Sequence, residues 1–472
     1  MSTPVRVRFA PSPTGYLHIG GLRSALYNWL FARKHGGVFA LRIEDTDRSR
    51  YVEGAVESLQ NALDRCGLKP DEGPYIQSER REQHLKYAYE LIEKDHAYYC
   101  FCTKERLEEV AKMQQLNKQP VMYDRHCRNL SKQEAENRAA VGDEHVIRLK
   151  VPLEGVCKMT DLIRGEVDIP WAQVDDQVLI KSDGYPTYHL AATCDDHDMK
   201  ISHVIRGEEW LSSLPKHLFI AECFGWTPPQ YAHLPLLLNP DKSKLSKRQG
   251  DVAVEDYLAK GYLPEALINF VALMGWNPTA DREIFTKEEL AELFDITKVN
   301  KSGAVFNHEK LDWLNGEYIK ALKVEDYLHR LQEGGFLPEG VEQERAARII
   351  QDRLAKLSDA VGLINEVIEL APYDASQLVW KKSNADEAKS RLEGVKTFLE
   401  AKDENWFGHI AKMEEETRAW IAGNGWGNGD TLWPLRVALS GREKSPSPFE
   451  LMFVRGKAAT LARIDEALEK MA

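Results

Sequence analysis

The sequence lacks any long hydrophobic run, because no apolar stretch reaches the roughly 18–20 residues that a membrane-spanning helix needs. Its first ten residues also lack the apolar segment of a secretory signal and the Ser- and Arg-rich character of a transit peptide. We therefore expect a cytoplasmic protein that does not contact a membrane. Internal repeats and low-complexity segments are missing too, which argues against repeat arrays, collagen and long disorder.

Positive charge is also in short supply, since 62 Lys and Arg stand against 74 Asp and Glu, a net charge of −12. This balance argues against a protein that simply coats nucleic acid, although a local basic surface would still attract phosphates. Cysteines are few, seven in all. Their odd number and scattered positions argue against a disulfide framework in a chain of this length.

With 472 residues the chain is too long for one compact core, and at roughly 100–200 residues each about three domains are expected. Strand-like and helix-like patterns alternate near the N-terminus, over residues 5–10, 20–35, 38–43 and 52–66. This alternation indicates an α/β unit with a parallel sheet. The pattern is interrupted at residues 96–189, resumes with a buried strand at 201–205, and gives way to helical periodicity from about residue 252.

A glycine-rich turn follows the first expected strand and ends in His18-Ile-Gly-Gly21. Such a position is where open α/β sheets bind ligands, and the two glycines would let a phosphate or flat ligand approach the backbone. The following helix N-terminus favours anions, and His18 could donate a hydrogen bond to a phosphate. Taken alone, so short a motif is better explained as a structural turn with a solvated histidine.

A basic loop, bounded by Pro240 and Gly250, forms the second feature of interest. Four cations lie within seven residues, namely Lys242, Lys244, Lys247 and Arg248. A mobile loop of this charge suits closure on a triphosphate and stabilisation of the charge that develops on pyrophosphate. Taken alone, it is better explained as a solvated charged loop.

Together the two segments resemble the HIGH and KMSK motifs of class I aminoacyl-tRNA synthetases, as His18-Ile-Gly-Gly21 and Lys244-Leu-Ser-Lys247. Further segments narrow the resemblance to bacterial-type glutamyl-tRNA synthetases, and they are residues 9–15, 41–47, 71–74, 182–188, 204–210, 264–267 and 432–441. The segments are colinear with the family pattern and cover essentially the whole chain.

The resemblance implies a fold class and a division into parts. We expect an α/β fold, with a Rossmann-like parallel-sheet catalytic domain that is split by an insertion and followed by all-α helical domains at the C-terminus. Residues 1–95 and 190–250 would form the catalytic domain, and 96–189 the insertion, a subdomain for the tRNA acceptor end. Residues 251–322 would be a helical stem-contact region, and 323–472 a helical anticodon-binding domain.

The resemblance also implies an activity, namely ATP-dependent attachment of L-glutamate to tRNA(Glu) through a glutamyl-adenylate, with ATP and Mg²⁺ as cofactors and a monomeric enzyme. Alternatives are a non-discriminating enzyme that also charges tRNA(Gln) with glutamate, and glutaminyl-tRNA synthetase. A shortened relative that modifies tRNA and a tRNA-binding protein without transfer activity are further alternatives. The helix-rich C-terminal third and the lead-in to the HIGH-like motif favour the glutamate enzyme.

Site residues follow from the matching motif positions. For glutamate, the resemblance implies that arginines face the carboxylates, an acidic group faces the ammonium and hydroxyls assist, with the set Arg8, Ala10, Ser12, Glu44, Tyr188 and Arg206. For ATP the set is His18, Gly20, Gly21, Glu209, Leu237, Lys244, Ser246 and Lys247, of which His18, Lys244 and Lys247 are catalytic. Ala192 departs from the family, since many relatives have Asn there, and this removes a contact to glutamate.

Cys100, Cys102 and Cys127 resemble the zinc site of some relatives, but Asn129 stands where those relatives have a ligating histidine. A structural Zn²⁺ needs four ligands, and Tyr123 or His126 could complete the set. Three reduced thiols in a small module are the alternative interpretation.

The C-terminal region is expected to read the anticodon. Residues 430–463 carry six basic residues against three acidic ones. The basic residues are Arg436, Arg442, Lys444, Arg455, Lys457 and Arg463. Trp433 and Phe449 could stack on unpaired bases. For each residue singly, a surface cation or a core aromatic is the alternative.

Overall fold

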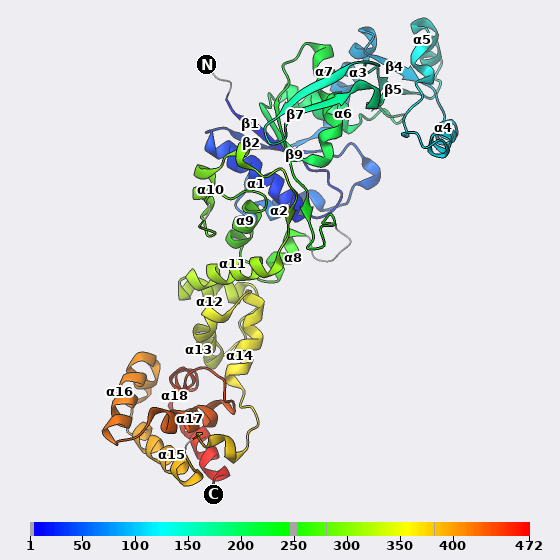
Figure 1. Ribbon diagram of the computed structural model, residues 1–472. Helices are drawn as coiled ribbons and strands as arrows, with labels where there is room; N and C mark the ends of the chain where they lie inside the picture. Colours follow the sequence, from blue (N-terminus) through cyan, green and yellow to red (C-terminus); the bar gives the residue numbers. More distant parts are fainter. Residues whose placement is uncertain (1–3, 246–252, 280, 382) are drawn as a thin grey trace. The chain divides into compact units, whose positions relative to one another are not determined.

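The computed structural model describes residues 4–245, 253–279, 281–381 and 383–472. The chain divides into two compact units. The first comprises Met1–Leu258 and Pro264–His308, and the second comprises Ala259–Leu263 and Glu309–Ala472. Figure 1 shows the helices of the first unit in blue to green and those of the second in yellow-green to red. The division into four parts stays a prediction.

The first unit mixes strands and helices throughout. Its strands are β1 (Arg6–Phe9), β2 (Val38–Ile43), β3 (Glu72–Ile76), β4 (Ala97–Cys100), β5 (Val146–Leu149), β6 (Val156–Asp161), β7 (Gly165–Pro170), β8 (Val178–Ile180), β9 (His203–Gly207), β10 (Gln230–Leu234), β11 (Leu237–Leu238) and β12 (Ala304–Val305). Its helices are α1 (Ile19–Lys34), α2 (Ala55–Arg65), α3 (Arg81–Glu93), α4 (Lys104–Leu116), α5 (Lys132–Ala140), α6 (Tyr188–Asp198), α7 (Leu214–Phe224), α8 (Val254–Ala259), α9 (Pro264–Ala272) and α10 (Lys287–Leu293).

The strands that carry the site are parallel. β1 pairs with β2 and β2 with β3, while β9 pairs with β10 and β10 with β6, all in parallel. The amide of Ser202 donates to the carbonyl of Arg6 at 2.9 Å, which brings β9 beside β1. The carboxyl ends of these strands therefore lie along one edge, where ligands of open α/β sheets bind. The predicted parallel sheet is confirmed.

Several elements of this unit were not predicted from the sequence, among them β3, β10 and the hairpin of β6 and β7. β3 contains Gly73 and Pro74, which are typical of turns rather than strands. β6 lies within the segment expected to be an insertion, yet it extends the parallel sheet, because Asp161 is in register with Tyr231 of β10. The rest of that segment forms an antiparallel sheet of β4, β5 and β8 with α4 and α5.

The second unit is helical. It contains α11 (His308–Ala321), α12 (Val324–Glu333), α13 (Val341–Ile350), α14 (Ala360–Ile368), α15 (Ala385–Glu400), α16 (Ile410–Gly423), α17 (Asn428–Ser440) and α18 (Pro448–Lys470). α18 begins with a capping box, because Ser447 accepts from the amide of Glu450 while the Glu450 side chain accepts from the amide of Ser447. The expected all-α C-terminal part is confirmed. None of the described helices is both long enough and apolar enough to cross a bilayer.

Candidate active site

A cavity of about 740 Å³ opens at the carboxyl ends of β1, β2 and β9. Every residue that the sequence assigned to glutamate or ATP and that the structure describes lines it, namely Arg8, Ala10, Ser12, His18, Gly20, Gly21, Glu44, Tyr188, Arg206, Glu209, Leu237 and Lys244. Ser246 and Lys247, the other two predicted residues, lie outside the described residues. Ala192 is buried one turn along α6 from Tyr188 and does not line the cavity.

The N-terminus of α1 opens on this cavity, and His18 caps it. The imidazole Nδ1 accepts a hydrogen bond from the amide of Gly21 at 3.0 Å. Because Nδ1 accepts, the proton of a neutral His18 is on Nε2, which makes Nε2 a donor. A Cβ on Gly20 would come within 3.0 Å of the imidazole. The glycine is therefore needed for the cap, and the helix N-terminus favours an anion here.

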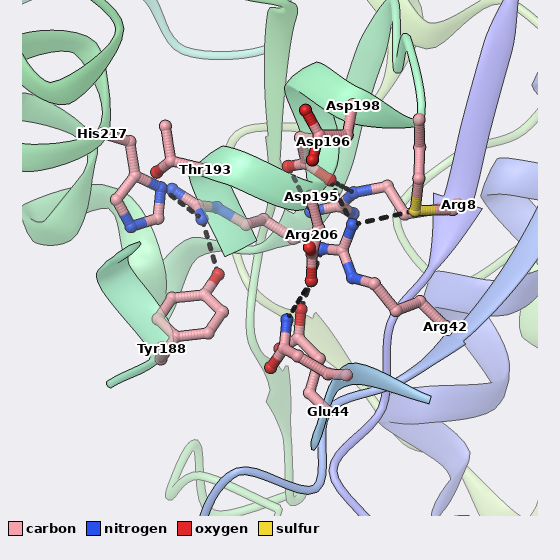
Figure 2. Close-up of polar contacts among 12 residues, drawn as sticks. Arg8, Arg42, Glu44, Tyr188, Thr193, Asp195, Asp196, Asp198, Arg206 and His217 are labelled. Atoms are coloured by element: carbon pink, nitrogen blue, oxygen red, sulfur yellow. Dashed lines mark hydrogen bonds and ion pairs between the residues drawn. The ribbon is translucent and has the colours of Figure 1, made fainter. Parts of the chain in front are cut away.

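A buried network of charges forms one wall of the cavity (Figure 2). Asp196 of α6 accepts from Arg8 Nε at 2.9 Å and from Arg42 Nη1 at 2.7 Å. Arg42, fully buried in β2, also donates from Nη2 to Glu44 at 2.9 Å. Positive and negative side chains thus alternate along the network, in the order Arg8, Asp196, Arg42 and Glu44. Each charge has an opposite neighbour, which a buried charge requires.

The two carboxyl groups of this network respond to it differently. Burial raises the pKa of Glu44 and outweighs the opposing effects of Arg42 and Arg8. Burial also acts to raise the pKa of Asp196, but Arg8 and Arg42 together lower it below its usual value. Asp196 is therefore a permanent anion that holds both arginines, whereas Glu44 is the carboxylate that lines the cavity.

Arg206 reaches the cavity from β9. Its Nη1 donates to the hydroxyl of Tyr188 at 2.7 Å, and its Nη2 donates to the carbonyl of Trp210 at 3.3 Å. Burial raises the pKa of Tyr188, although Arg206 opposes the shift, so the phenol keeps its proton. The ring of Trp210 lies 4.3 Å from that of Tyr188 and packs against it.

The charges around the cavity match an amino acid with two carboxylates. Within the network and its neighbour Arg206, three guanidinium groups (Arg8, Arg42, Arg206) outnumber two carboxylates (Glu44, Asp196), so this part of the wall carries an excess of positive charge. A dicarboxylic amino acid carries one net negative charge at neutral pH. Its carboxylates suit the planar guanidinium groups and its ammonium suits Glu44.

The comparisons with known proteins agree with this geometry. Residues 4–313 match the family described as class I tRNA synthetases (E and Q), catalytic domain, and residues 308–468 match an anticodon binding domain. The chain belongs to the class I glutamyl/glutaminyl-tRNA synthetase family. Because both matches are present, this synthetase is not the shortened type that lacks an anticodon-binding part.

Individual relatives span the whole synthetase. The chain is 44% identical to the glutamate–tRNA ligase of Chloroherpeton thalassium, over 99% of this chain and 98% of the relative. It is 42% identical to the glutamate–tRNA ligase of Clostridium acetobutylicum, over 99% of both chains. The crystal structure of a glutamate tRNA ligase from Elizabethkingia meningosepticum in complex with its amino acid superposes with a TM-score of 0.88, at 35% identity and over 100% of both chains.

Two residues of the site network were missed by sequence reasoning. Arg42 carried a signal, because a charged residue inside an apolar strand that ends in acidic residues needs a buried partner. Asp196 carried a weaker one, as one of three aspartates near the end of a helix whose middle is buried. Asp45 and Asp47, to which no role was given, accept from Ser78 and Arg50, so both are locally satisfied.

The cysteine cluster of the synthetase is not among the residues that line the cavity: Cys100 ends β4, Cys102 follows it, and Cys127 lies on a 3-10 helix (His126–Asn129). The sulfur atoms of Cys100, Cys102 and Cys127 all lie within 4.8 Å of one another. The Tyr123 hydroxyl is 3.3 Å from the Sγ atoms of both Cys100 and Cys102. Of the two candidates for a fourth ligand, Tyr123 is therefore the one that converges on the thiols. His126 is not part of this cluster among the described residues.

The donor set suits zinc. The hydrogen bond from Cys127 lowers the pKa of Cys100, with help from Tyr123 and against the effect of burial. Zinc is bound by thiolate sulfur, so a thiol that loses its proton easily is a good ligand. Three sulfurs and one hydroxyl oxygen that lie close together also supply the number of ligands that a structural zinc site needs.

In the anticodon region, one aromatic prediction is wrong. Phe449 is 1% exposed in the core of the second unit, so it cannot stack on a base. Arg455 is also buried, and it donates to the carbonyls of Val367 and Ile368 at 3.2 and 3.0 Å. Trp433 packs against Trp380 with ring centroids 4.7 Å apart. Packing within the helical unit uses these side chains, which the composition of the segment could not show.

Proposed function

We propose that this chain activates L-glutamate with ATP to form glutamyl-adenylate and then transfers the glutamyl group to tRNA(Glu). The observation that carries the proposal is the cavity, in which two arginines and Glu44 face a capped helix N-terminus and Lys244. Full-length relatives named glutamate–tRNA ligases support glutamate over glutamine. Glutaminyl-tRNA synthetase is therefore not the favoured function.

In this proposal Arg8 and Arg206 bind the carboxylates of glutamate, and Glu44 binds its ammonium. Ala10, Ser12 and Tyr188 complete the pocket. Arg8 is preorganised for this task, because Asp196 holds Nε and Nη2, and Nη1 has no partner among the described residues. A guanidinium fixed in advance loses little conformational entropy when the substrate binds.

The nucleotide part of the site performs a transfer that depends on positioning and electrostatics. Gly20, Gly21, Glu209 and Leu237 would seat ATP. His18 Nε2 would donate to a phosphate, and Lys244, Ser246 and Lys247 would contact the triphosphate. Aminoacyl-tRNA synthetases generally use ATP with Mg²⁺, which when bound neutralises phosphate charge. The attacking α-carboxylate of glutamate and the α-phosphate would meet between the two halves of the cavity.

The remaining assignments complete the proposal. A structural Zn²⁺ would be bound by Cys100, Cys102, Cys127 and Tyr123. The enzyme would act as a monomer in the cytoplasm, where free cysteines like its own stay reduced. Residues 96–189 would contact the acceptor end of the tRNA, 251–322 its stem and 323–472 its anticodon.

A tRNA-dependent ATP–pyrophosphate exchange assay tests the function. Exchange with glutamate and none with glutamine is the expected result, and exchange with glutamine alone would overturn the proposal. Charging tRNA(Glu) and tRNA(Gln) transcripts separately with glutamate then tests partner choice. We expect only tRNA(Glu) to be charged, and charging of both would identify a non-discriminating enzyme.

A further inference from the structure

Arg206 differs from the other arginines of the cavity in the partners that hold it. Arg8 and Arg42 are bound by Asp196, whereas no partner of Arg206 among the described residues carries a charge. Its Nε donates to His233 Nε2 at 3.1 Å, and its Nη1 donates to His217 Nδ1 at 3.3 Å as well as to Tyr188. The side chain is nevertheless buried, with 7% of the residue exposed.

His233 is in turn held by a carboxylate. Its Nδ1 lies 2.7 Å from Asp161 Oδ2, and neither side chain is exposed. Arg206 Nε can only donate, so His233 Nε2 must accept and the imidazole proton must be on Nδ1, facing Asp161. The chemistry of the two neighbours therefore fixes the tautomer of His233.

The carboxylate of Asp161 is itself fixed by backbone amides. Oδ1 accepts from Ile163 at 2.9 Å and from Arg164 at 2.8 Å, while Oδ2 accepts from the amide of His233 at 3.1 Å. Burial acts to raise the pKa of Asp161, but the bond from His233 and these amides lower it. Burial lowers the pKa of His233 despite Asp161. The pair is thus an ionised carboxylate beside a neutral imidazole.

Three adjacent strands bring these groups into line. Arg206 on β9 is in register with His233 on β10, and β10 pairs with β6, which ends at Asp161. The line of contacts runs across the sheet, so its geometry is set by backbone pairing. It ends at the face of the cavity where Arg206 and Tyr188 lie.

We propose that Asp161 and His233 are positioning residues for amino-acid recognition, which hold Arg206 in place through a neutral acceptor so that its positive charge stays available for a substrate carboxylate. The inference rests on the proposed function. A carboxylate in direct contact with Arg206 would orient it equally well but would offset the charge. A charged donor also discriminates between a carboxylate and an uncharged amide, because charge-assisted hydrogen bonds are the stronger ones.

The variant Asp161→Asn tests the tautomer. The amides of Ile163 and Arg164 retain the side-chain oxygen, which turns the new amide group toward His233 Nδ1. That nitrogen must then accept, so the imidazole proton moves to Nε2 and points at Arg206. We expect the KM for glutamate to rise at least about tenfold in tRNA-dependent exchange, as when one hydrogen bond to a charged group is lost, with the KM for ATP within about twofold.

Two substitutions at His233 separate the acceptor from the fold. In His233→Gln the side-chain oxygen can reach the place of Nε2 and accept from Arg206, whereas the shorter side chain of His233→Asn stops near the place of Nδ1. We expect His233→Gln to keep a KM for glutamate close to the parent value and His233→Asn to raise it as Asp161→Asn does. His84→Gln is the matched control. His84 Nε2 lies 2.8 Å from Asp195 Oδ1 in an equally buried pair, and this pair does not contact Arg206.

The outcomes distinguish the inference from the function beneath it. A parent enzyme without glutamate-dependent exchange would overturn the proposed function itself. An active parent with equal KM values for His233→Gln and His233→Asn would overturn the positioning role, as would an unchanged KM in folded Asp161→Asn. A rise in the KM for glutamate in His84→Gln of the same size would show a general effect of lost stability and would also overturn it. Thermal melting of each variant monitors folding.

Discussion

Arg8 and Asp196 are 188 residues apart in the sequence and form a two-point ion pair, with Nε–Oδ1 and Nη2–Oδ2 distances of 2.9 and 3.3 Å. The pair connects β1 to α6, and Arg8 also lines the cavity. Asp196 Oδ1 also accepts a hydrogen bond from Arg42 Nη1 at 2.7 Å, so one carboxylate holds both arginines. In the proposed function, recognition of the amino acid therefore depends on Asp196 and Arg42, which do not themselves line the cavity.

The first prediction concerns Arg8. Arg8→Gln removes a charged donor to a substrate carboxylate, while Asp196 keeps Arg42 as its partner. We expect the KM for glutamate to rise at least about tenfold and the KM for ATP to change much less. Steady-state exchange kinetics measure both. Arg33→Gln is the control, since Arg33 forms a surface pair with Asp71 at 2.8 Å. An equal effect of Arg8→Gln on both substrates would count against its role.

The second prediction concerns Lys247, which lies outside the described residues. Lys247→Ala removes a cation expected to stabilise the pyrophosphate leaving group, and adenylate formation should slow at least about tenfold. Removing one donor to a transition state raises the activation free energy by ~2.7–4 kcal/mol, and this range is an upper limit for the effect expected here. Lys242→Ala tests whether any cation of this loop would serve, and it should have little effect. An unchanged exchange rate in Lys247→Ala would refute the assignment.

The third prediction concerns the cysteine cluster. Purified enzyme should contain one zinc per chain by elemental analysis, and Cys100→Ser should lose it. Cys157→Ser is the control, because Cys157 is a buried free cysteine outside the cluster. Tyr123→Phe should weaken zinc retention against a chelator if the phenol is the fourth ligand. Zinc-free parent enzyme would instead support three reduced thiols.

The fourth prediction concerns acid stability. Burial acts to raise the pKa of Asp195, but His84, Arg42 and Gln77 lower it to about 2, below the ordinary 3.8. A lowered pKa in the folded state means that Asp195 stabilises the fold above pH 3.8, and that this contribution is lost as the pH falls toward 2. At neutral pH it amounts to roughly 2 kcal/mol.

The measurement compares the melting temperature of the parent enzyme with that of Asp195→Asn between pH 6 and pH 2.5, in the range set by these pKa values. We expect the variant to melt at a lower temperature at pH 6 and the difference to shrink as the solution is acidified. A difference that stays constant with pH would mean that the charge of Asp195 does not contribute.

Parts of the fold could be predicted because they depend on local patterns. α1 is expected at residues 20–35 and observed at Ile19–Lys34, and β2 is predicted without error at Val38–Ile43. Apolar residues at helical or strand spacing report which face will be buried, whatever the rest of the chain does. β3 escaped prediction because its glycine and proline are typical of turns, and only its pairing with β2 makes it a strand.

By itself, the sequence determined the chemical parts of the site and their family. His18, Gly20 and Lys244 belong to short contiguous motifs, and Arg8 and Glu44 stand at the ends of strands that can be read locally. Only the tertiary structure decided which groups hold the arginines Arg8 and Arg206 in place. Asp196, His233 and Asp161 acquire their roles through strand order and helix packing, because a buried charge is paired by neighbours in space. The same packing buried Phe449, and no local pattern in the sequence could reveal that burial.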